Sequence, residues 1–174
     1  MRNIRMKTVT KLNEKKTNNK MKRDAIISKC GKYRYSLIRE WNSNKGKVLF
    51  IMLNPSKADH KKDDPTVKRC INFAKDWGYG GLMIGNLFSY RTTYPKELFK
   101  TKYLEGKDNL KHIKQMIKRS DLVICAWGNK QGIPPKYLRE LTDLHYLKLL
   151  VDGKTPGHPL FLKKDSKPKK FNFQ

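Results

Sequence analysis

Three apolar runs of strand length dominate the hydrophobic pattern of the chain, at residues 49–53, 82–88 and 121–127. None of them alternates apolar and polar positions, so both faces of each strand should be buried, as in the centre of a parallel sheet. The run at 49–53 is followed at once by Asn-Pro-Ser. Pro55 cannot donate to a ladder, so pairing should stop there and the chain should leave the sheet at the strand's carboxyl end.

Segments with helical spacing separate these runs. Asp64 can cap a helix that Pro65 opens and Gly78 ends, with apolar residues every three or four positions between them. Residues 144–150 predict a fourth strand, with a continued helix as the alternative. Further helices are predicted after Pro95, over 110–119 and after Pro135.

This alternation of strands and helices predicts an α/β fold with right-handed crossovers. We expect three layers, α/β/α, around a central, mostly parallel four-stranded sheet. Residues 26–41 add an N-terminal antiparallel strand or hairpin at its flank. We divide the chain into a basic, flexible arm (1–23), a single α/β domain (24–162) and a basic C-terminal tail (163–174).

The charge of the chain points to a polyanionic partner. It carries 40 Lys and Arg against 15 Asp and Glu, a formal net charge of +25. Such an excess predicts that the partner is nucleic acid, with DNA as the first candidate, before an anionic membrane surface. A lysine-rich solvated surface without any partner is the alternative. No apolar run approaches the roughly 20 residues that span a bilayer, so no membrane segment is expected.

The cysteines and histidines do not predict a metal site. Cys30, Cys70 and Cys125 are far apart, and the four histidines are scattered. We interpret the cysteines as reduced core or near-core residues of a cytoplasmic protein, which we expect to be a monomer. Neither GxGxxG nor a phosphate-binding loop ending in Lys-Ser/Thr is present, and we expect no cofactor.

Polar and aromatic residues follow each predicted strand. Parallel strands deliver their exit loops to one edge of the sheet, where ligands of open α/β sheets bind. A buried Asn can pair with the edge of a base, an aromatic ring can stack on it, and Arg or Lys can hold phosphate. The candidate ligand-binding residues are Asn54, Pro55, Ser56, Asn86, Tyr90, Arg91, Trp127, Gly128, Asn129 and His158, with Lys57, Arg69 and Lys130 as candidate contacts to a nucleic-acid backbone.

Each of these residues has a structural alternative. Asn54 before a proline suits an Asx-turn. Asn86 inside an apolar strand needs partners, which a neighbouring loop can supply as well as a ligand. Trp127 suits the core, and His158 suits an ordinary loop.

Two resemblances add to this pattern. The motifs LNPSKAD, DDPTVKRCINFAKDWGYGGL, NLFSYRTTYP, AWGN and GHPLFL, within residues 33–162, resemble an uncharacterised bacterial and phage domain family of unknown function. More distantly, their order is similar to the uracil-DNA glycosylase superfamily. LNPS (53–56) stands where that superfamily has motifs such as GINPG, NLFSYR (86–91) resembles its second motif, and GHP (157–159) resembles its final HPS loop. The glycine of the first motif and the serine of the last are absent here.

The second resemblance implies a function. It implies that Asn54 positions the attacking water and that His158 faces the carbonyl of a flipped base. We therefore expect a nucleic-acid-directed enzyme that hydrolyses the N-glycosidic bond of a modified or damaged base, with Asn86 reading the base edge. A non-catalytic DNA- or RNA-binding module and an enzyme acting on free nucleotides or nucleosides are the alternatives.

Overall fold

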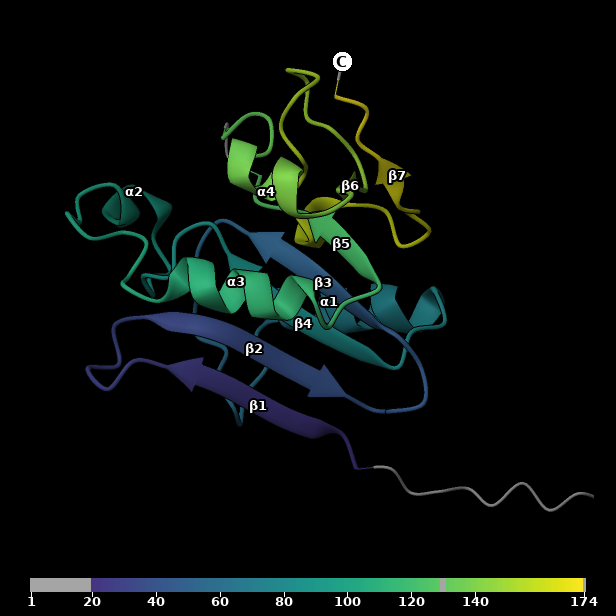
Figure 1. The fold of residues 1–174 in the computed structure, drawn as a ribbon, viewed down its shortest axis with the longest axis horizontal. Coiled ribbons are helices and arrows are strands. Elements are labelled where there is room, and N and C mark those ends of the chain that lie inside the picture. Colours follow the sequence, from purple (N-terminus) through teal and green to yellow (C-terminus); the bar gives the residue numbers. More distant parts are fainter. Residues whose placement is uncertain (1–19, 129–130, 174) are drawn as a thin grey trace, which may run out of the picture.

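The structure, a computed structural model, describes residues 20–128 and 131–173. It is an α/β fold around a seven-stranded mixed sheet in the order β1-β2-β4-β3-β5-β6-β7 (Figure 1). Strands β4, β3, β5 and β6 are parallel, whereas β1, β2 and β7 pair antiparallel with their neighbours. The strands are β1 (Lys22–Ile27), β2 (Arg34–Glu40), β3 (Lys47–Met52), β4 (Gly81–Asn86), β5 (Leu122–Cys125), β6 (His145–Tyr146) and β7 (Lys169–Lys170).

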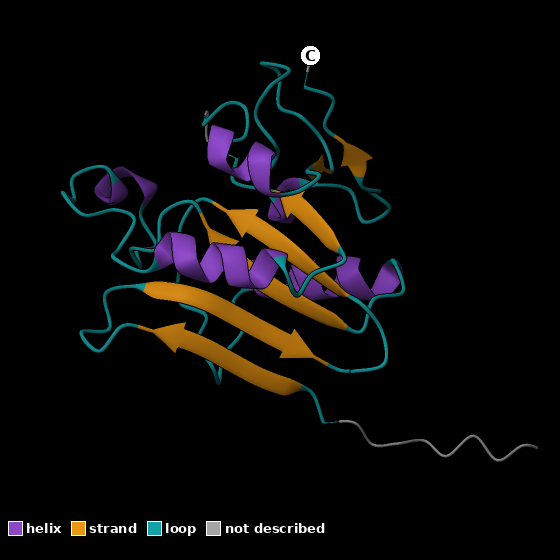
Figure 2. Ribbon diagram, viewed as in Figure 1, coloured by secondary structure: helices purple, strands orange, loops and turns teal. Residues whose placement is uncertain are grey.

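Helices cover both faces of this sheet (Figure 2). Val48, Phe50 and Met52 of β3 pack with α1, and Leu49 and Ile51 pack with α3. This alternation leaves residues 48–51 fully buried, because each face of β3 has its own helix. The helices are α1 (Pro65–Asp76), α2 (Pro95–Leu98), α3 (Asn109–Ile117), α4 (Lys136–Leu141) and the short 3-10 helix η1 (Pro159–Phe161).

The parallel pairing brings the ends of the central strands to one edge. Met52 of β3 pairs with Asn86 of β4, and Ile51 of β3 pairs with Cys125 of β5. The loops that follow these three strands therefore leave the sheet at neighbouring positions. As predicted, Asp64 caps α1 by accepting a hydrogen bond from the Val67 amide.

The C-terminal part differs most from the expected pattern. β6 contains only His145 and Tyr146, although the apolar pattern predicted a strand over 144–150. Beyond it the chain turns back at Asp152, whose carboxylate accepts from the amides of Lys154 and Thr155, and Leu149 forms a bridge with Pro156. Within the expected tail, Lys169 and Lys170 form β7 against β6.

The N-terminal hairpin begins earlier than the sequence pattern indicated. β1 starts at Lys22, so the last residues of the expected arm lie in the sheet, while residues 1–19 of that arm lie outside the described residues. Cys70 and Cys125 are buried, as expected of core cysteines, but Cys30 is exposed because it sits in the turn between β1 and β2. None of the described helices is long and apolar enough to cross a membrane.

Candidate functional site

Two adjoining cavities open at the carboxyl ends of the central strands. The polar cavity, about 60 Å³, lies between β3, β4 and the start of α1 and is lined by Asn54, Ser56, Asn86 and His158. The apolar cavity, about 250 Å³, is lined by Leu53, Trp127, Gly128 and Phe161. Both are bordered by Met52, Asn54 and His158, so we treat them as one strand-end site. The structure thus brings together residues from three exit loops that are far apart in the sequence.

Asn86 is the most unusual residue of this site. Its side chain is 2% exposed, and neither its amide nitrogen nor its amide oxygen has a partner among the described residues. Its backbone carbonyl accepts from the side chain of Asn109, which holds the end of β4 in place. A buried polar group without a partner costs about 1–3 kcal/mol. Asn86 therefore offers one donor face and one acceptor that no described residue uses.

Asn54 combines a structural role with a free acceptor. Its side-chain nitrogen donates to the carbonyls of Thr92 at 2.9 Å and Pro55 at 3.2 Å. These bonds fix the amide group and tie the exit loop of β3 to the loop that follows β4. No described residue donates to the side-chain oxygen, which can therefore accept from an occupant of the two cavities that Asn54 lines.

His158 is held as a hydrogen-bond donor. Its Nδ1 accepts from the Leu160 amide at 3.4 Å, an arrangement that favours the proton of the neutral imidazole on Nε2. Burial lowers the pKa of His158, and Asp64 partly opposes that shift. Gly128 allows the close approach of the loops, because it has φ +61° and an added Cβ would lie 3.1 Å from the Cβ of His158.

Arg34 and Asp64 also line the polar cavity, and sequence reasoning gave neither a role in binding. Arg34 is 3% exposed, and one terminal nitrogen donates to the Ala58 carbonyl at 2.8 Å. Its Nε has no partner among the described residues. Burial lowers the pKa of Arg34 to about 10, so it remains a cation at pH 7, with Asp64 as a nearby countercharge. Asp64 is the one carboxylate among the described residues that line the two cavities.

A β-bulge directs Arg34 into this site. The register of β1 and β2 shifts between Ile26, which pairs with Ser36, and Ile27, which pairs with Arg34. Tyr35 is the extra residue, and it packs against His112 on the α3 side of the sheet. The bulge thereby places the Arg34 side chain on the α1 side of the sheet. Regular alternation along β2 would have placed it on the α3 side. An arginine inside a strand that is otherwise buried was the only sequence signal for this role.

Other predicted residues contribute less to the strand-end site or lie outside it. Trp127 is 1% exposed and packs in the core, where its indole nitrogen donates to the Gly132 carbonyl, and it also lines the apolar cavity. Tyr90, Arg91 and Lys57 line a separate basin of about 520 Å³, which meets the polar cavity at Ser56.

The remaining predicted residues have structural roles or are not described. Arg69 donates to the Leu162 carbonyl and lies over Phe73, so it anchors the C-terminal loop to α1. Pro55 is buried, and its carbonyl accepts from the amide of Thr92. Asn129 and Lys130 lie outside the described residues.

The polar cavity contains several kinds of chemical group. Within the described ranges, no group of three or more His, Cys, Asp or Glu side chains is placed to hold a metal ion. The polar cavity instead combines an acid (Asp64), a cation (Arg34), a neutral imidazole donor (His158) and two amides. Such a set can bind a planar heterocycle and orient a water molecule beside it.

Comparison with known proteins identifies a family. Searches of curated proteins and of solved structures found no protein significantly similar to this chain. Residues 34–169 match a family described as "Protein of unknown function (DUF1643)", and this match covers both the strand-end site and the central sheet. The chain belongs to this family of unknown function, as the motif pattern of the sequence predicted.

Proposed function

We propose that the protein hydrolyses the N-glycosidic bond of a base that is flipped out of nucleic acid into the strand-end site. The observation that carries this proposal is the buried Asn86 amide, which lacks partners among the described residues and shares its cavity with Asp64 and His158. An amide presents a donor and an acceptor side by side, which matches the edge of a pyrimidine or purine. A base whose edge complements the Asn86 amide forms these hydrogen bonds and so offsets the free-energy cost of burying the amide. A base without that edge leaves the amide unpaired.

The apolar cavity would receive the ring of the base. Its volume is about 250 Å³, and Leu53, Trp127 and Phe161 provide apolar contacts around it. Phe161 is 82% exposed, so it stands at the open side of the cavity. Flipping costs a few kcal/mol of stacking, which these contacts and the Asn86 hydrogen bonds offset.

The polar cavity would supply the reaction. Asn54 and Asp64 accept hydrogen bonds from a water molecule and orient it toward the sugar C1′. As the water oxygen bonds to C1′, the C1′–N bond breaks, its electron pair leaves with the base, and a water proton passes to Asp64. The Nε2–H of His158 donates to the developing anion of the base, and the Arg34 cation stabilises the same negative charge.

The resemblance to the uracil-DNA glycosylase superfamily supports this assignment. The residues that match its motifs, Asn54 in LNPS and His158 in GHP, both border the two cavities. The finer fold assignment, a three-layer glycosylase-like α/β/α domain, is part of the proposal. The net charge of +25 would supply salt-dependent affinity for the nucleic-acid backbone through counterion release.

The test is an abasic-site assay with the full chain. Single- and double-stranded oligonucleotides containing uracil, hydroxymethyluracil or a mismatch are incubated with the protein and then cleaved with alkali. We expect abasic product from at least one substrate. Asp64→Asn should lower its rate by about 100-fold or more, because Asn still caps α1 but cannot take the proton. Failure to form abasic product from any substrate would contradict the proposal.

A non-catalytic nucleic-acid-binding module is the second candidate, and the net charge of +25 favours it. It predicts binding that weakens steeply with salt and no turnover of any of these substrates. The same assay, combined with a binding titration at several salt concentrations, separates the two candidates.

A further inference from the structure

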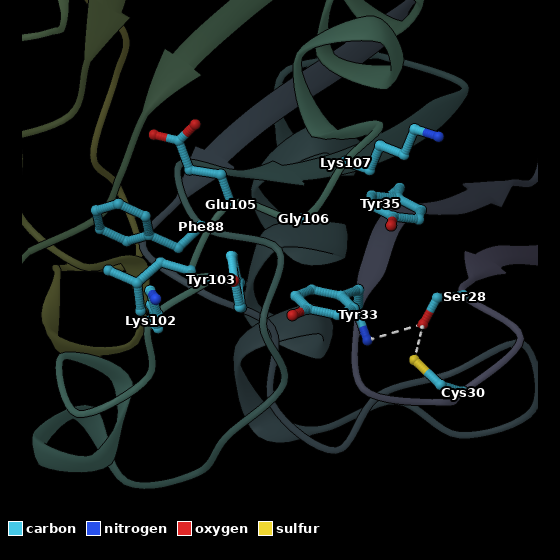
Figure 3. A pocket seen from close by; sticks show the side chains of 11 residues that line it. Ser28, Cys30, Tyr33, Tyr35, Phe88, Lys102, Tyr103, Glu105, Gly106 and Lys107 are labelled. Atoms are coloured by element: carbon cyan, nitrogen blue, oxygen red, sulfur yellow. Dashed lines mark hydrogen bonds between the residues drawn. The ribbon is translucent and has the colours of Figure 1, made fainter.

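A further pocket, about 750 Å³, lies away from the strand-end site, beside the turn between β1 and β2 (Figure 3). We call it the aromatic groove. Its walls are Tyr33 and Tyr35 from the hairpin, Phe88 from the loop after β4, and the segment 102–107 that precedes α3. Tyr103 is 67% exposed, and its ring lies between Phe88 and Tyr33 in this view.

The groove is built into the fold. Segment 102–107 is fixed by two hydrogen bonds to the loop after β4: the Ser89 hydroxyl donates to the Glu105 carbonyl, and the Tyr90 amide donates to the Leu104 carbonyl. At Gly106, with φ +70°, an added Cβ would lie 2.9 Å from the Tyr33 ring, so the backbone itself rests on the tyrosine. The wall that faces the hairpin is therefore preformed.

The aromatic rings form a platform with one accessible end. The rings of Tyr33 and Tyr35 are nearly parallel, at 6° and 6.4 Å between centroids, and Tyr35 stacks in turn on His112 at 5.1 Å. Tyr35 is buried in the middle of this column, and both tyrosines line the groove. A preformed aromatic column that ends at an open groove is suited to stacking a base.

The charges beside the groove favour an anionic occupant. Lys102 and Lys107 line it, and Glu105 is the one acidic residue among its lining residues. In Figure 3 the carboxylate of Glu105 points away from the rings of Tyr33 and Tyr103. Rings for stacking together with lysines for phosphate match a nucleic-acid strand whose bases are unpaired.

The groove also continues toward the strand-end site. It shares Cys30 with the basin, whose walls include Lys32, Lys57 and Arg91. The basin in turn meets the polar cavity at Ser56. Tyr33 lines the groove and Tyr90 lines the basin. The two rings make an edge-to-face contact, with centroids 5.8 Å apart. This sequence of pockets forms one track along the surface, with aromatic residues at one end and the polar cavity at the other.

We propose that this track binds a single-stranded segment of nucleic acid, with a base stacked between Tyr33 and Tyr103 and the phosphates that follow it held by Lys32, Lys57 and Arg91. The inference deepens the proposed function, because it makes single-stranded or locally opened nucleic acid the substrate class. Binding along the track requires no turnover, so it is tested separately from glycosidic hydrolysis.

Cys30 provides a native probe of the track. It is exposed at the boundary between groove and basin, whereas Cys70 and Cys125 are buried. The Ser28 hydroxyl lowers the pKa of the Cys30 thiol, and burial raises the pKa of the other two thiols, so a maleimide should label Cys30 selectively. A strand lying along the track covers Cys30 and slows this labelling.

The experiment compares three polyanions as protectants of Cys30 in the full chain. They are an oligothymidylate of about 16 nucleotides, an oligomer of equal length without bases, and inorganic polyphosphate. We expect oligothymidylate to slow the labelling of Cys30 at least tenfold at saturation, and the two polymers without bases to slow it less than twofold. No protection by oligothymidylate, or equal protection by polyphosphate, overturns the proposal.

Variants separate stacking from charge. Tyr103→Ala should weaken oligothymidylate binding about tenfold and leave the affinity for the base-free oligomer unchanged. Lys102→Glu should weaken both. Phe173→Ala is the matched control, since Phe173 is also exposed but lies beyond β7 at the opposite edge of the sheet. Unchanged oligothymidylate affinity in Tyr103→Ala refutes the stacking role.

The outcomes also distinguish this inference from the proposed function. Protection of Cys30 without abasic product from any substrate leaves the track standing and removes the glycosylase. Abasic product without protection of Cys30 supports the glycosylase and removes the track.

Discussion

Two buried arginines on the same strand have different environments. Arg39 is fully buried, and each of its side-chain nitrogens donates, including a 2.7 Å bond from Nε to Asp63. Its other acceptors include the carbonyl of Asp59, so it holds the 57–64 loop against the sheet. Arg34 is 3% exposed, but its Nε has no partner among the described residues.

Asn86 at the end of β4 and Asn109 at the start of α3 differ in how far their amides are bonded. The Asn109 nitrogen donates to the carbonyls of Asn86 and Leu87, and only its Oδ1 lacks a partner among the described residues, whereas both side-chain polar atoms of Asn86 lack one. Polar groups that are buried and bonded stabilise a fold, whereas polar groups that are buried and unbonded cost stability and need another reason to be present. Arg34 and Asn86 both line the polar cavity, and we take a ligand to be that reason.

The largest expected effect is the loss of stability in Arg39→Met. This change leaves the Asp63 carboxylate, 7% exposed, with Arg23 as its remaining partner, whose side chain is 36% exposed. Removing one member of a buried ion pair costs about 3–5 kcal/mol. Equilibrium urea unfolding should show this loss, and a loss below about 1 kcal/mol would contradict a structural role for Arg39.

The asparagine pair should give changes of opposite sign. Asn86→Leu should raise the free energy of unfolding by about 1–3 kcal/mol, because it removes two unpaired polar atoms. Asn109→Leu should lower it by a similar amount, because two carbonyls lose their donor. Urea unfolding of both variants measures this difference. If both variants are destabilised, Asn86 has a structural partner and the comparison fails.

Arg34→Met should change stability by no more than about 1 kcal/mol, because the one hydrogen bond that it loses is offset by the removal of a buried cation. Its effect should appear in function instead. Abasic-product formation should fall while the urea midpoint stays near that of the parent protein. A stability loss equal to that of Arg39→Met would show that the two arginines play the same role.

The smallest effect concerns pH. Burial lowers the pKa of His158 below its unfolded value, so the unfolded state takes up its proton first as the pH falls. The contribution of His158 to stability is therefore complete above about pH 6.5 and declines below it. His158→Gln should flatten the fall in stability between pH 7 and pH 5. Burial also lowers the pKa of His112, so His112→Gln is a control with the same sign outside the strand-end site. An unchanged slope in His158→Gln would contradict the burial of its imidazole.

The sequence pattern predicted the centre of the fold well. The run at 49–53 became β3 with both faces buried, and Asp64 capped α1, because these features depend on local composition and on uninterrupted apolar spacing. Asn54, Asn86 and His158 meet because parallel strands end at one edge, which the alternation of strands and helices already implied.

What the sequence did not predict depends on long-range geometry. The bulge that turns Arg34 toward Asp64 is a one-residue shift in pairing, and hydrophobic spacing carries no signal for it. The short β6 is followed by a turn at Asp152, which an apolar run cannot show. Tyr90 and Arg91 follow β4 as expected, but their backbone is tied to the hairpin and to segment 102–107, so they line the basin and not the cavity.

The most direct test of the account is the side-chain amide signal of Asn86 in a ¹H–¹⁵N spectrum, assigned by its loss in Asn86→Leu. Free nucleobases and nucleosides are titrated into the labelled protein. We predict that at least one base shifts the Asn86 side-chain signals saturably while those of Asn109 stay in place. Asn86 signals that remain unmoved by every base and nucleoside would contradict the assignment of the strand-end cavity as a base-binding site.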